Sequence, residues 1–387
     1  MNTDIIIIGG GIAGLSLAYF LEFNKFNVKV LERDINVKSR KQGFSLTMQK
    51  NTKSILEKYN LLDKIISLGK RARKQVFYDD KGNIIHIDRY NDSSRFNYPL
   101  PRKDILQLFI DRLNSETIVW NSKVTNIEIN EEYTTVILEN NQKYIAKYVV
   151  ACDGLNSTIR KKFLPDIVPN DLKLYNIYGL VDISKVSQNC REHFDETEIQ
   201  ILDGNHRFFS KPYDENKQMW ELTWNEAEEV LRGDHEDQRQ YALDMSKKEI
   251  KEWPIPWLQE FMDNTKSEDI LVHPLYDIDP KEINFNKLYD VTHRIIFIGD
   301  TIHSMAPYIG MGANEAFFDA FNVCEMFINM RKFNYENYKQ HIETFHEECA
   351  ERTQKTVLRS RENVKFYHSS DACDKQKLYK FKKWDIL

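Results

Sequence analysis

The sequence predicts an α/β fold in which two separated segments build one α/β domain around an inserted, mainly antiparallel β-sheet, with a helical region at the carboxyl end. Three observations predict it. The chain opens with strand, helix and strand patterns in direct succession. Short, aromatic-rich strand patterns then occupy residues 172–272. A β-branched strand returns at 294–298 and leads into long helical patterns.

The opening segment is predicted to be a βαβ unit. Residues 4–8 and 28–31 are runs of mostly β-branched residues, and residues 13–24 have apolar side chains at helical spacing. The following elements are predicted as a helix over 52–69, a hairpin over 75–78 and 84–87, a helix over 102–113, and strands over 134–138 and 148–152. In the insertion, strands are predicted at 175–183, 198–202, 207–210 and 219–224, with a charged helical segment after them.

These patterns divide the chain into three parts. Residues 1–171 and 273–330 are expected to form the discontinuous α/β domain, with a hairpin near 75–100 as a candidate to join the other sheet. Residues 172–272 are expected to form the β domain and residues 331–387 a helical region. The segment 351–387 carries ten Lys or Arg against five acids, which favours a solvated helix packing one apolar face over a membrane-surface anchor.

Composition excludes several classes of function. The 387 residues contain 54 Lys and Arg against 59 Asp and Glu, so no positive field favours nucleic acid. No apolar run is long enough to span a bilayer, and the amino terminus lacks signal-peptide features, so a cytoplasmic protein is expected, as a monomer or weak dimer. The five cysteines are scattered and predict reduced thiols, with no disulfide framework and no metal site. Aromatic residues make up 12%, enough to line a flat pocket.

The first motif is G-x-G-x-x-G, formed by Gly9, Gly11 and Gly14 between the first strand and the first helix. Glycine is needed there because the turn is tight and a pyrophosphate must approach the backbone at the helix N-terminus. Glu32 closes the second strand 18 residues after Gly14, where a carboxylate can accept ribose hydroxyls. These features together favour a dinucleotide site over a structural glycine turn. The neighbouring Arg33 fits an adenine contact and an ordinary surface position about equally well.

Two further motifs follow strands. The segment from Gly299 reads GDTIHSMAPYIGMGAN, in which an acid ends a strand and glycines begin a helix. Such a helix N-terminus stabilises negative charge on a bound ring. The segment from Cys152 reads CDGLNS and is followed by Arg160, again with an acid and a glycine after a strand.

These three motifs, in this order, resemble the group A flavin-dependent aromatic hydroxylases, the family of para-hydroxybenzoate hydroxylase. The family pattern GDAAHxxxPxxGxGxN is the most specific match. The stretches ERDINVKSR, DDKGNII and RFNYPLPRKDILQLFIDRL are similar to the tetracycline-inactivating monooxygenases. The resemblance covers about 1–165 and 290–325. It implies a Rossmann-like FAD-binding domain of the glutathione-reductase type, with the insertion as the substrate domain.

The resemblance also implies site residues. Arg40 is the candidate contact for NADPH or NADH, the expected co-substrate. Thr47 stands where the tetracycline-inactivating relatives have an aspartate at the flavin, so that contact would involve a hydroxyl. The implied FAD contacts are Gly9, Gly11, Gly14, Glu32, Arg33, Thr47, Arg102, Asp153, Asp300, Pro307, Gly312, Ala313 and Asn314. The implied flavin-ring environment is Pro307, Gly310, Met311, Gly312 and Asn314. For Arg102 a surface helix position, and for Asp153 a structural turn, remain open.

The resemblance implies a single-component monooxygenase that transfers one oxygen atom from O2 through a flavin C4a-hydroperoxide, with no acid–base residue assigned. His303 is expected to be structural rather than a catalytic base. The WPIPW segment from Trp253 does not match the halogenase WxWxIP element, which disfavours halogenation. Two alternatives stay open: an FAD oxidase or dehydrogenase without oxygen insertion, and a flavin- or ligand-binding protein without turnover.

The expected substrate is a planar aromatic, phenolic or polyketide-like small molecule, with a tetracycline-like antibiotic as one case. Tetracycline itself is disfavoured because Tyr178 replaces a glutamine of the relatives' FNIQ strand, and because GNR becomes GNHR, ending at Arg207. Some aromatic residues of the insertion must face its core, since strand side chains alternate. The substrate candidates are Tyr178, Arg207, Phe209, Trp220 and Trp224.

Overall fold

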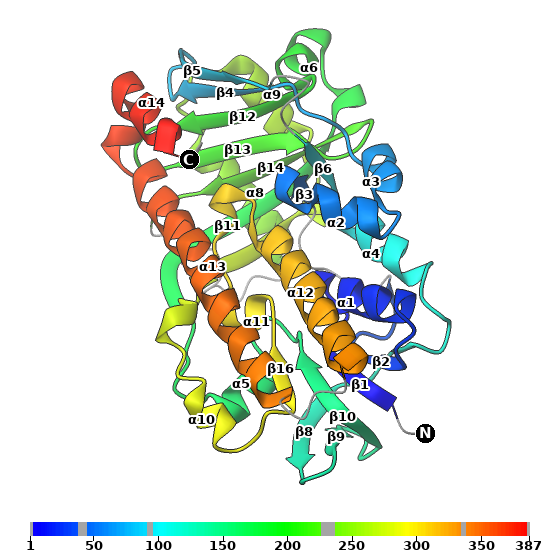
Figure 1. Cartoon of the computed structure of the whole chain (residues 1–387). Coiled ribbons are helices and arrows are strands. Elements are labelled where there is room, and N and C mark those ends of the chain that lie inside the picture. Colours follow the sequence, from blue (N-terminus) through cyan, green and yellow to red (C-terminus); the bar gives the residue numbers. More distant parts are fainter. Residues whose placement is uncertain (1–2, 38–44, 91–95, 226–236, 334–337, 385–387) are drawn as a thin grey trace.

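A computed structural model of the chain describes residues 3–37, 45–90, 96–225, 237–333 and 338–384. Figure 1 shows two sheets at opposite ends of the molecule, with long helices running between and beside them. The first sheet, around β1, carries the α/β half. The second sheet, around β11 and β14, is the mainly antiparallel one. The predicted α/β class with an antiparallel insertion is confirmed.

The first sheet has seven strands in the order β7-β2-β1-β10-β9-β8, with β16 also paired to β10. Its strands are β1 (Thr3–Ile8), β2 (Val28–Leu31), β7 (Ile118–Val119), β8 (Val124–Ile129), β9 (Thr134–Leu138), β10 (Lys143–Ala151) and β16 (Ile295–Phe297). The pairings β1 with β2, β1 with β10, β2 with β7, and β10 with β16 are parallel. Ile295 faces Val149, so residues nearly 150 positions apart share one sheet edge. The five parallel strands β7, β2, β1, β10 and β16 therefore have their carboxyl ends at the same side of the sheet.

Helices cover this sheet and bury its strands. The central β1 strand is almost wholly buried because both faces are covered, as in parallel α/β sheets. Helix α1 packs against α12 and α4. The helices of this half and its extensions are α1 (Ile12–Phe23), α2 (Lys53–Lys58), α3 (Leu62–Leu68), α4 (Arg102–Ile110), α5 (Thr158–Phe163), α10 (Asn286–Tyr289), α11 (Asp300–His303), α12 (Gly312–Phe333), α13 (Tyr338–Tyr367) and α14 (Lys375–Trp384).

The second sheet has the order β15-β11-β14-β13-β12-β4-β5. Its strands are β4 (Lys74–Asp79), β5 (Ile84–Arg89), β11 (Asn170–Asp182), β12 (Thr197–Leu202), β13 (Arg207–Pro212), β14 (Lys217–Thr223) and β15 (Leu271–Asp277). The β4–β5 hairpin joins it through parallel pairing of β4 with β12. This sheet therefore contains segments from both sides of the 172–272 insertion.

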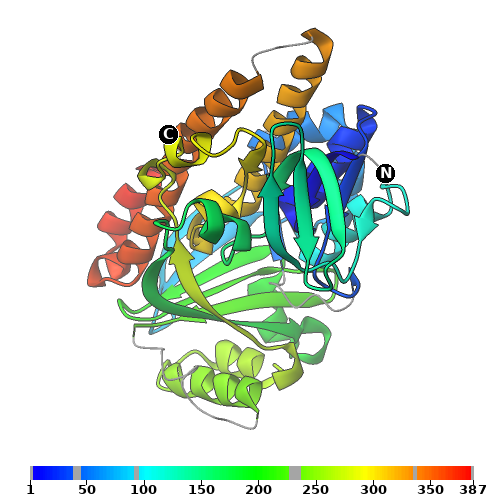
Figure 2. The same ribbon diagram turned by 90° about the horizontal axis from the view of Figure 1, so that it is seen from below.

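The two faces of this sheet differ in chemistry. One face is apolar and packs against α6 (Gln188–Phe194), α8 (Gln238–Glu249) and α9 (Pro256–Asp263), which Figure 2 shows on the side away from the rest of the molecule. Trp220, Leu222 and Trp224 lie in that core. The alternate residues of β14, such as Glu221 and Thr223, point to the other face. The sheet thus presents a polar face toward the α/β half.

Two smaller elements join the halves. Strands β3 (Ser45–Gln49) and β6 (Asn97–Pro101) pair with each other, and β3 contacts α12. The long helix α13 packs against α11, α12 and the short 3-10 turn Pro307–Ile309. Figure 1 shows α13 running along the molecule from the first sheet toward the second. These elements bring the end of the α/β half against the polar sheet face.

One predicted helix is interrupted in the structure. The single helix expected over 52–69 is divided into α2 and α3, because Asn60 adopts a left-handed backbone with φ of 57° between them.

Among the described residues, no helix combines the length and the apolarity needed to cross a bilayer.

The contact between Gly179 and Trp220 predicts a coupled pair of substitutions. A Cβ atom at Gly179 would lie 2.3 Å from Cε2 of Trp220, so Gly179→Ala should destabilise the protein by about 1–3 kcal/mol through overpacking. Phenylalanine lacks the indole atoms that the new methyl would meet. The alanine should therefore cost less in a Trp220→Phe background, measured by urea unfolding of all four proteins. Equal costs in both backgrounds would contradict this packing.

Candidate functional site

The glycine loop follows β1 and begins helix α1. Gly9 has φ of 100°, a conformation that residues with a side chain rarely adopt. A Cβ atom at Gly14 would lie 1.9 Å from the Gly9 carbonyl oxygen, so the helix can approach the turn only without a side chain there. The open amide groups at the start of α1 are suited to an anion such as a pyrophosphate.

Glu32 lies beside this loop, at the end of β2. Its Oε2 accepts a hydrogen bond from the Gly10 amide at 2.6 Å, and its Oε1 accepts one from the Asp34 amide at 2.9 Å. The side chain is buried, whereas Arg33 is exposed. The backbone therefore fixes the Glu32 carboxylate against the glycine loop, where ribose hydroxyls can reach it.

Arg102 approaches the same loop from α4. A Cβ atom on Gly11 would lie 4.0 Å from Nη2 of Arg102, so the guanidinium stands directly beside the glycine turn. Pro101 precedes it in extended conformation and starts the helix at Arg102. The structure thus places the loop glycines and Glu32 together with Arg102, which lies 70 residues after Glu32 in the sequence. Arg40 falls outside the described residues.

The segment after β16 carries the second acid. Gly299 has φ of 66° and turns the chain into the short helix α11, which begins at Asp300. The Asp300 side chain is exposed. The Asp153–Gly154 turn after β10 lies close by, since Arg160 donates to the Thr301 carbonyl at 2.8 Å and also to the Leu155 carbonyl. Arg160, which the sequence reasoning left without a role, connects the two strand ends.

Asp153 caps a helix. Its carboxylate accepts hydrogen bonds from the Ser157 hydroxyl at 2.6 Å and the Thr158 amide at 2.7 Å. Burial raises the pKa of Asp153, and these hydrogen bonds oppose the shift. Gly154 has φ of 77°, and a Cβ there would meet nothing within 4 Å. The structure gives Asp153 a structural task, and leaves open space in front of Gly154.

A buried polar network supports the segment that carries Asp300. Oδ2 of Asp319, on α12, accepts hydrogen bonds from the Gly299 amide at 2.8 Å and from Nε2 of His303 at 2.6 Å. Its Oδ1 accepts from Arg352 of α13 and from the Cys349 thiol. His303, Asp319 and Cys349 offer three atoms within 4.8 Å of one another, a spacing that could hold a metal ion, but the Arg352 guanidinium already supplies a cation to this carboxylate.

The segment expected at the flavin ring lies at the start of α12. Gly310 is left-handed, with φ of 64°. Asn314 is fully buried; its amide nitrogen donates to the Thr47 carbonyl at 2.8 Å, and its oxygen accepts from the Gln49 amide at 2.9 Å. Asn314 therefore fixes β3 against the helix N-terminus. This places Thr47 beside the segment that contains Pro307, Gly310, Met311, Gly312 and Ala313.

Tyr308 joins this segment to the polar face of the second sheet. Its hydroxyl lies 2.9 Å from the Thr223 hydroxyl and 2.7 Å from Nε2 of His368. Burial lowers the pKa of His368 to about 4, so the ring is neutral. Because Nδ1 of His368 bonds the Asn205 carbonyl, that nitrogen carries the proton and Nε2 accepts from Tyr308. Burial also raises the pKa of Tyr308 to about 12, which keeps it a donor.

Arg207 lies under the Tyr308 ring, with the guanidinium carbon 4.4 Å from the ring centroid. It is 2% exposed, donates to Gln200 at 2.9 Å and pairs with Glu221 at 3.3 Å. Tyr178 lies opposite Glu221 on the neighbouring strand and accepts a hydrogen bond from Asn176 at 2.8 Å. Arg207, Tyr178 and Phe209 therefore share one sheet face.

The other two substrate candidates are elsewhere. Trp220 and Trp224 point to the opposite face, in the core under α6, α8 and α9. Trp220 is fully buried and donates its indole N–H to Thr265 at 3.0 Å. Because β14 alternates its side chains, neither tryptophan can share a face with Glu221. Their role in the structure is core packing, and the expectation of substrate contact for them is wrong.

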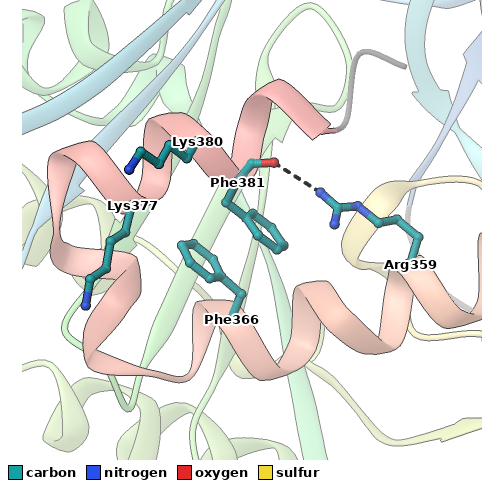
Figure 3. Close-up of a pocket in the computed structure, with 5 residues that line it drawn as sticks. All are labelled: Arg359, Phe366, Lys377, Lys380 and Phe381. Atoms are coloured by element: carbon teal, nitrogen blue, oxygen red, sulfur yellow. Dashed lines mark hydrogen bonds between the residues drawn. The ribbon is translucent and has the colours of Figure 1, made fainter.

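A small pocket of about 290 Å³ lies between α13 and α14, apart from these residues (Figure 3). The rings of Phe366 and Phe381 stack in the pocket wall with their centroids 3.9 Å apart, and Arg359 donates to the Phe381 carbonyl at 3.1 Å. Lys382 of α14 lies over Phe77 and pairs with Asp88 at 3.3 Å. Helix α14 thus packs on the β4–β5 hairpin.

A family model, related sequences and solved structures all match this chain to FAD-binding proteins. The model of the family described as "FAD binding domain" matches residues 2–360. The FAD-dependent monooxygenase nscC of Arthroderma benhamiae is 23% identical over 403 residues, covering 95% of each chain. A structure of Klebsiella pneumoniae HpxO complexed with FAD and uric acid has a TM-score of 0.82 at 18% identity, covering 98% of this chain and 92% of that one. The tetracycline destructase Tet(51) has a TM-score of 0.71 at 18% identity, covering 100% and 97%.

The residues present fit an FAD molecule. The glycine turn is a cradle that a Cβ at Gly14 would fill, Gly154 faces open space, and Glu32 and Asp300 provide carboxylates near two helix N-termini. Such a donor set suits a diphosphate, sugar hydroxyls and a ring that becomes negatively charged.

The Asp319 network predicts a stability effect with a functional consequence. Asp319→Asn would remove one of the two carboxylates that pair with the partly buried Arg352, leaving only Glu315, and should lower the free energy of unfolding by about 3 kcal/mol. Because Gly299 and His303 lose their anchor, the purified variant should also hold less FAD, measured by flavin absorbance per protein. Glu347→Gln, at an exposed position of α13, serves as control. Unchanged stability and FAD content in Asp319→Asn would contradict this role.

Proposed function

The chain belongs to the FAD binding domain family and is a flavin-dependent monooxygenase of the aromatic-hydroxylase type, and we propose that it consumes NAD(P)H to hydroxylate a planar aromatic, phenolic or polyketide-like small molecule. One observation carries the proposal. The segment expected at the flavin ring meets the polar face of the second sheet through Tyr308, Thr223 and Arg207. A flat molecule bound between them would lie against both.

In this proposal the α/β half holds FAD. Gly9, Gly11, Gly14, Glu32 and Arg102 would bind the ADP portion, with Arg33 at its exposed rim. Asp153 and Asp300 would lie along the central portion. Pro307, Gly310, Met311, Gly312, Ala313, Asn314 and Thr47 would surround the ring. Bound FAD supplies the redox chemistry, which is reduction by NAD(P)H and activation of O2.

The protein itself contributes position and charge control. The N-terminus of α12 would stabilise negative charge on the ring, and Asn314 keeps that helix end fixed against β3. Tyr178 and Phe209 would provide the flat wall, and Arg207 fixes Tyr308 over that wall. No side chain is assigned as an acid or base, and His303 is committed to Asp319. Arg40 remains the candidate for NAD(P)H.

Tyr178 makes a tetracycline a less suitable substrate than a smaller phenol. Its ring fills the position where the tetracycline-inactivating relatives carry an amide, and burial raises the pKa of its hydroxyl well above the usual value. The Tyr178 hydroxyl is therefore neutral and accepts a hydrogen bond from Asn176. Compared with the relatives' amide side chain, the Tyr178 ring leaves less space for a substrate and has no amide N–H to donate. Tetracyclines belong in the substrate screen as a comparison.

The proposal predicts a yellow protein that retains FAD and oxidises NAD(P)H slowly alone. A screen of phenols, polyketide-like compounds and tetracyclines should find ligands that accelerate this oxidation. With labelled O2, one heavy oxygen atom should appear in the product by mass spectrometry. Accelerated oxidation that gives only peroxide and an unlabelled or desaturated product would instead indicate an oxidase or dehydrogenase. A colourless protein that does not bind added FAD would exclude both.

A further inference from the structure

Lys211 is a buried lysine on the polar face of the second sheet. It lies on β13 opposite Met219, two residues after Phe209, so its side chain points the same way as Arg207 and Phe209. It is only 8% exposed. Among the described residues, its ammonium forms one hydrogen bond, to the Thr47 hydroxyl at 3.2 Å. The sequence reasoning had not identified it.

The buried Lys211 ammonium has fewer hydrogen-bond acceptors and counter-charges around it than its three N–H groups and its positive charge require. An ammonium carries three N–H donors, and burying a charge with a single neutral partner is costly. The two carboxylates whose charges act on Lys211 have other partners: Glu221 pairs with Arg207 at 3.3 Å, and Glu198 accepts from Tyr90 at 2.7 Å. Neither lies within ion-pair distance of Lys211 in the described structure. Burial lowers the pKa of Lys211, and the charges of Glu221 and Glu198 oppose that shift.

The position of Lys211 indicates what it could bind. Thr47 lies in β3, and Asn314, near the N-terminus of α12, donates a hydrogen bond to the Thr47 carbonyl. Lys211 therefore reaches the place where the sheet face meets the expected flavin ring. Leu180, Tyr213 and Met219 form a buried cluster against which Tyr178 and Phe209 pack. These apolar and aromatic side chains form a flat patch within the otherwise polar sheet face, with the Lys211 cation at its border.

We propose that Lys211 is a specificity-determining residue that binds an ionised oxygen of the substrate, a carboxylate, phenolate or enolate, while the substrate ring lies against Tyr178 and Phe209. The inference rests on the proposed function and narrows its substrate class to anionic aromatic compounds. Arg207 is less suited to the same task, because the Glu221 carboxylate already balances its charge and Gln200 accepts from its Nε. Among the described residues, Lys211 is the cation on this wall without a carboxylate partner.

The stability of the ligand-free protein provides the first test. Replacing an under-compensated buried cation by an apolar side chain of similar length should stabilise the protein, so Lys211→Met should unfold at a higher temperature than the wild type. A purely structural lysine that only held Thr47 would have the opposite effect. Lys143→Met, on the exposed surface of β10, is the matched control and should leave the melting temperature unchanged.

Ligand binding provides the second test, on FAD-loaded protein. Salicylate and 4-hydroxybenzoate are compared with their neutral amides, using the change in flavin absorbance to obtain dissociation constants. The wild type should prefer each carboxylate by at least about 10-fold, since charge-assisted hydrogen bonds are strong in buried sites. Lys211→Met should lose this preference while its affinity for the amides changes little. Lys211→Arg should keep part of it.

Several results would overturn the inference. These are equal binding of acids and amides by the wild type, no binding of either acid, a lower melting temperature of Lys211→Met, or an unchanged acid preference in that variant. A variant with reduced FAD content would instead show that Lys211 serves the flavin, which also overturns it. Failure of the proposed function is distinct, because it appears as absence of FAD from the wild-type protein itself.

Discussion

The parallel pairing of β16 with β10 is the constraint on which the candidate site depends. Without it, the Gly299–Asp300 segment would have no fixed relation to the glycine loop almost 290 residues earlier. Because β1, β2, β10 and β16 run in the same direction, their carboxyl ends deliver the glycine turn, Glu32, the Asp153–Gly154 turn and Asp300 to one edge. Arg160 and Asp319 then fix the loops beyond those ends.

The sequence predicted the parts of this arrangement that local patterns determine. The glycine turn, the first helix and the strand ending at Glu32 follow from residue types a few positions apart. The contacts made by Asp319 and Arg160 could not be predicted in the same way. An acid in the middle of an apolar helix has no local signature for the amide of Gly299, which is 20 residues away and reached only after α12 folds back.

The two tryptophans show that one error was avoidable. In β14, apolar Trp220 and Leu222 alternate with Met219, Glu221 and Thr223, and a strand has only two faces. The acid in this strand therefore indicates the polar face, and the tryptophans belong to the other. Lys211 was harder to find, because a single lysine in a strand normally indicates solvent exposure. Its burial becomes visible only when β3 and the α12 N-terminus cover that end of the sheet.

Four buried or partly buried cations of the described residues differ in the partners that the protein gives them. Arg160 donates to two carbonyls, Arg352 contacts the carboxylates of Asp319 and Glu315, and Arg207 has Gln200, Glu221 and an aromatic ring. Each of these three has at least two partners in the protein, and Arg352 and Arg207 each pair with a carboxylate. Lys211 alone among these four has a single neutral partner. A deficit as large as that of Lys211 is tolerated most readily where binding supplies the missing charge, and Lys211 stands at such a place, the border between the sheet face and the cofactor half.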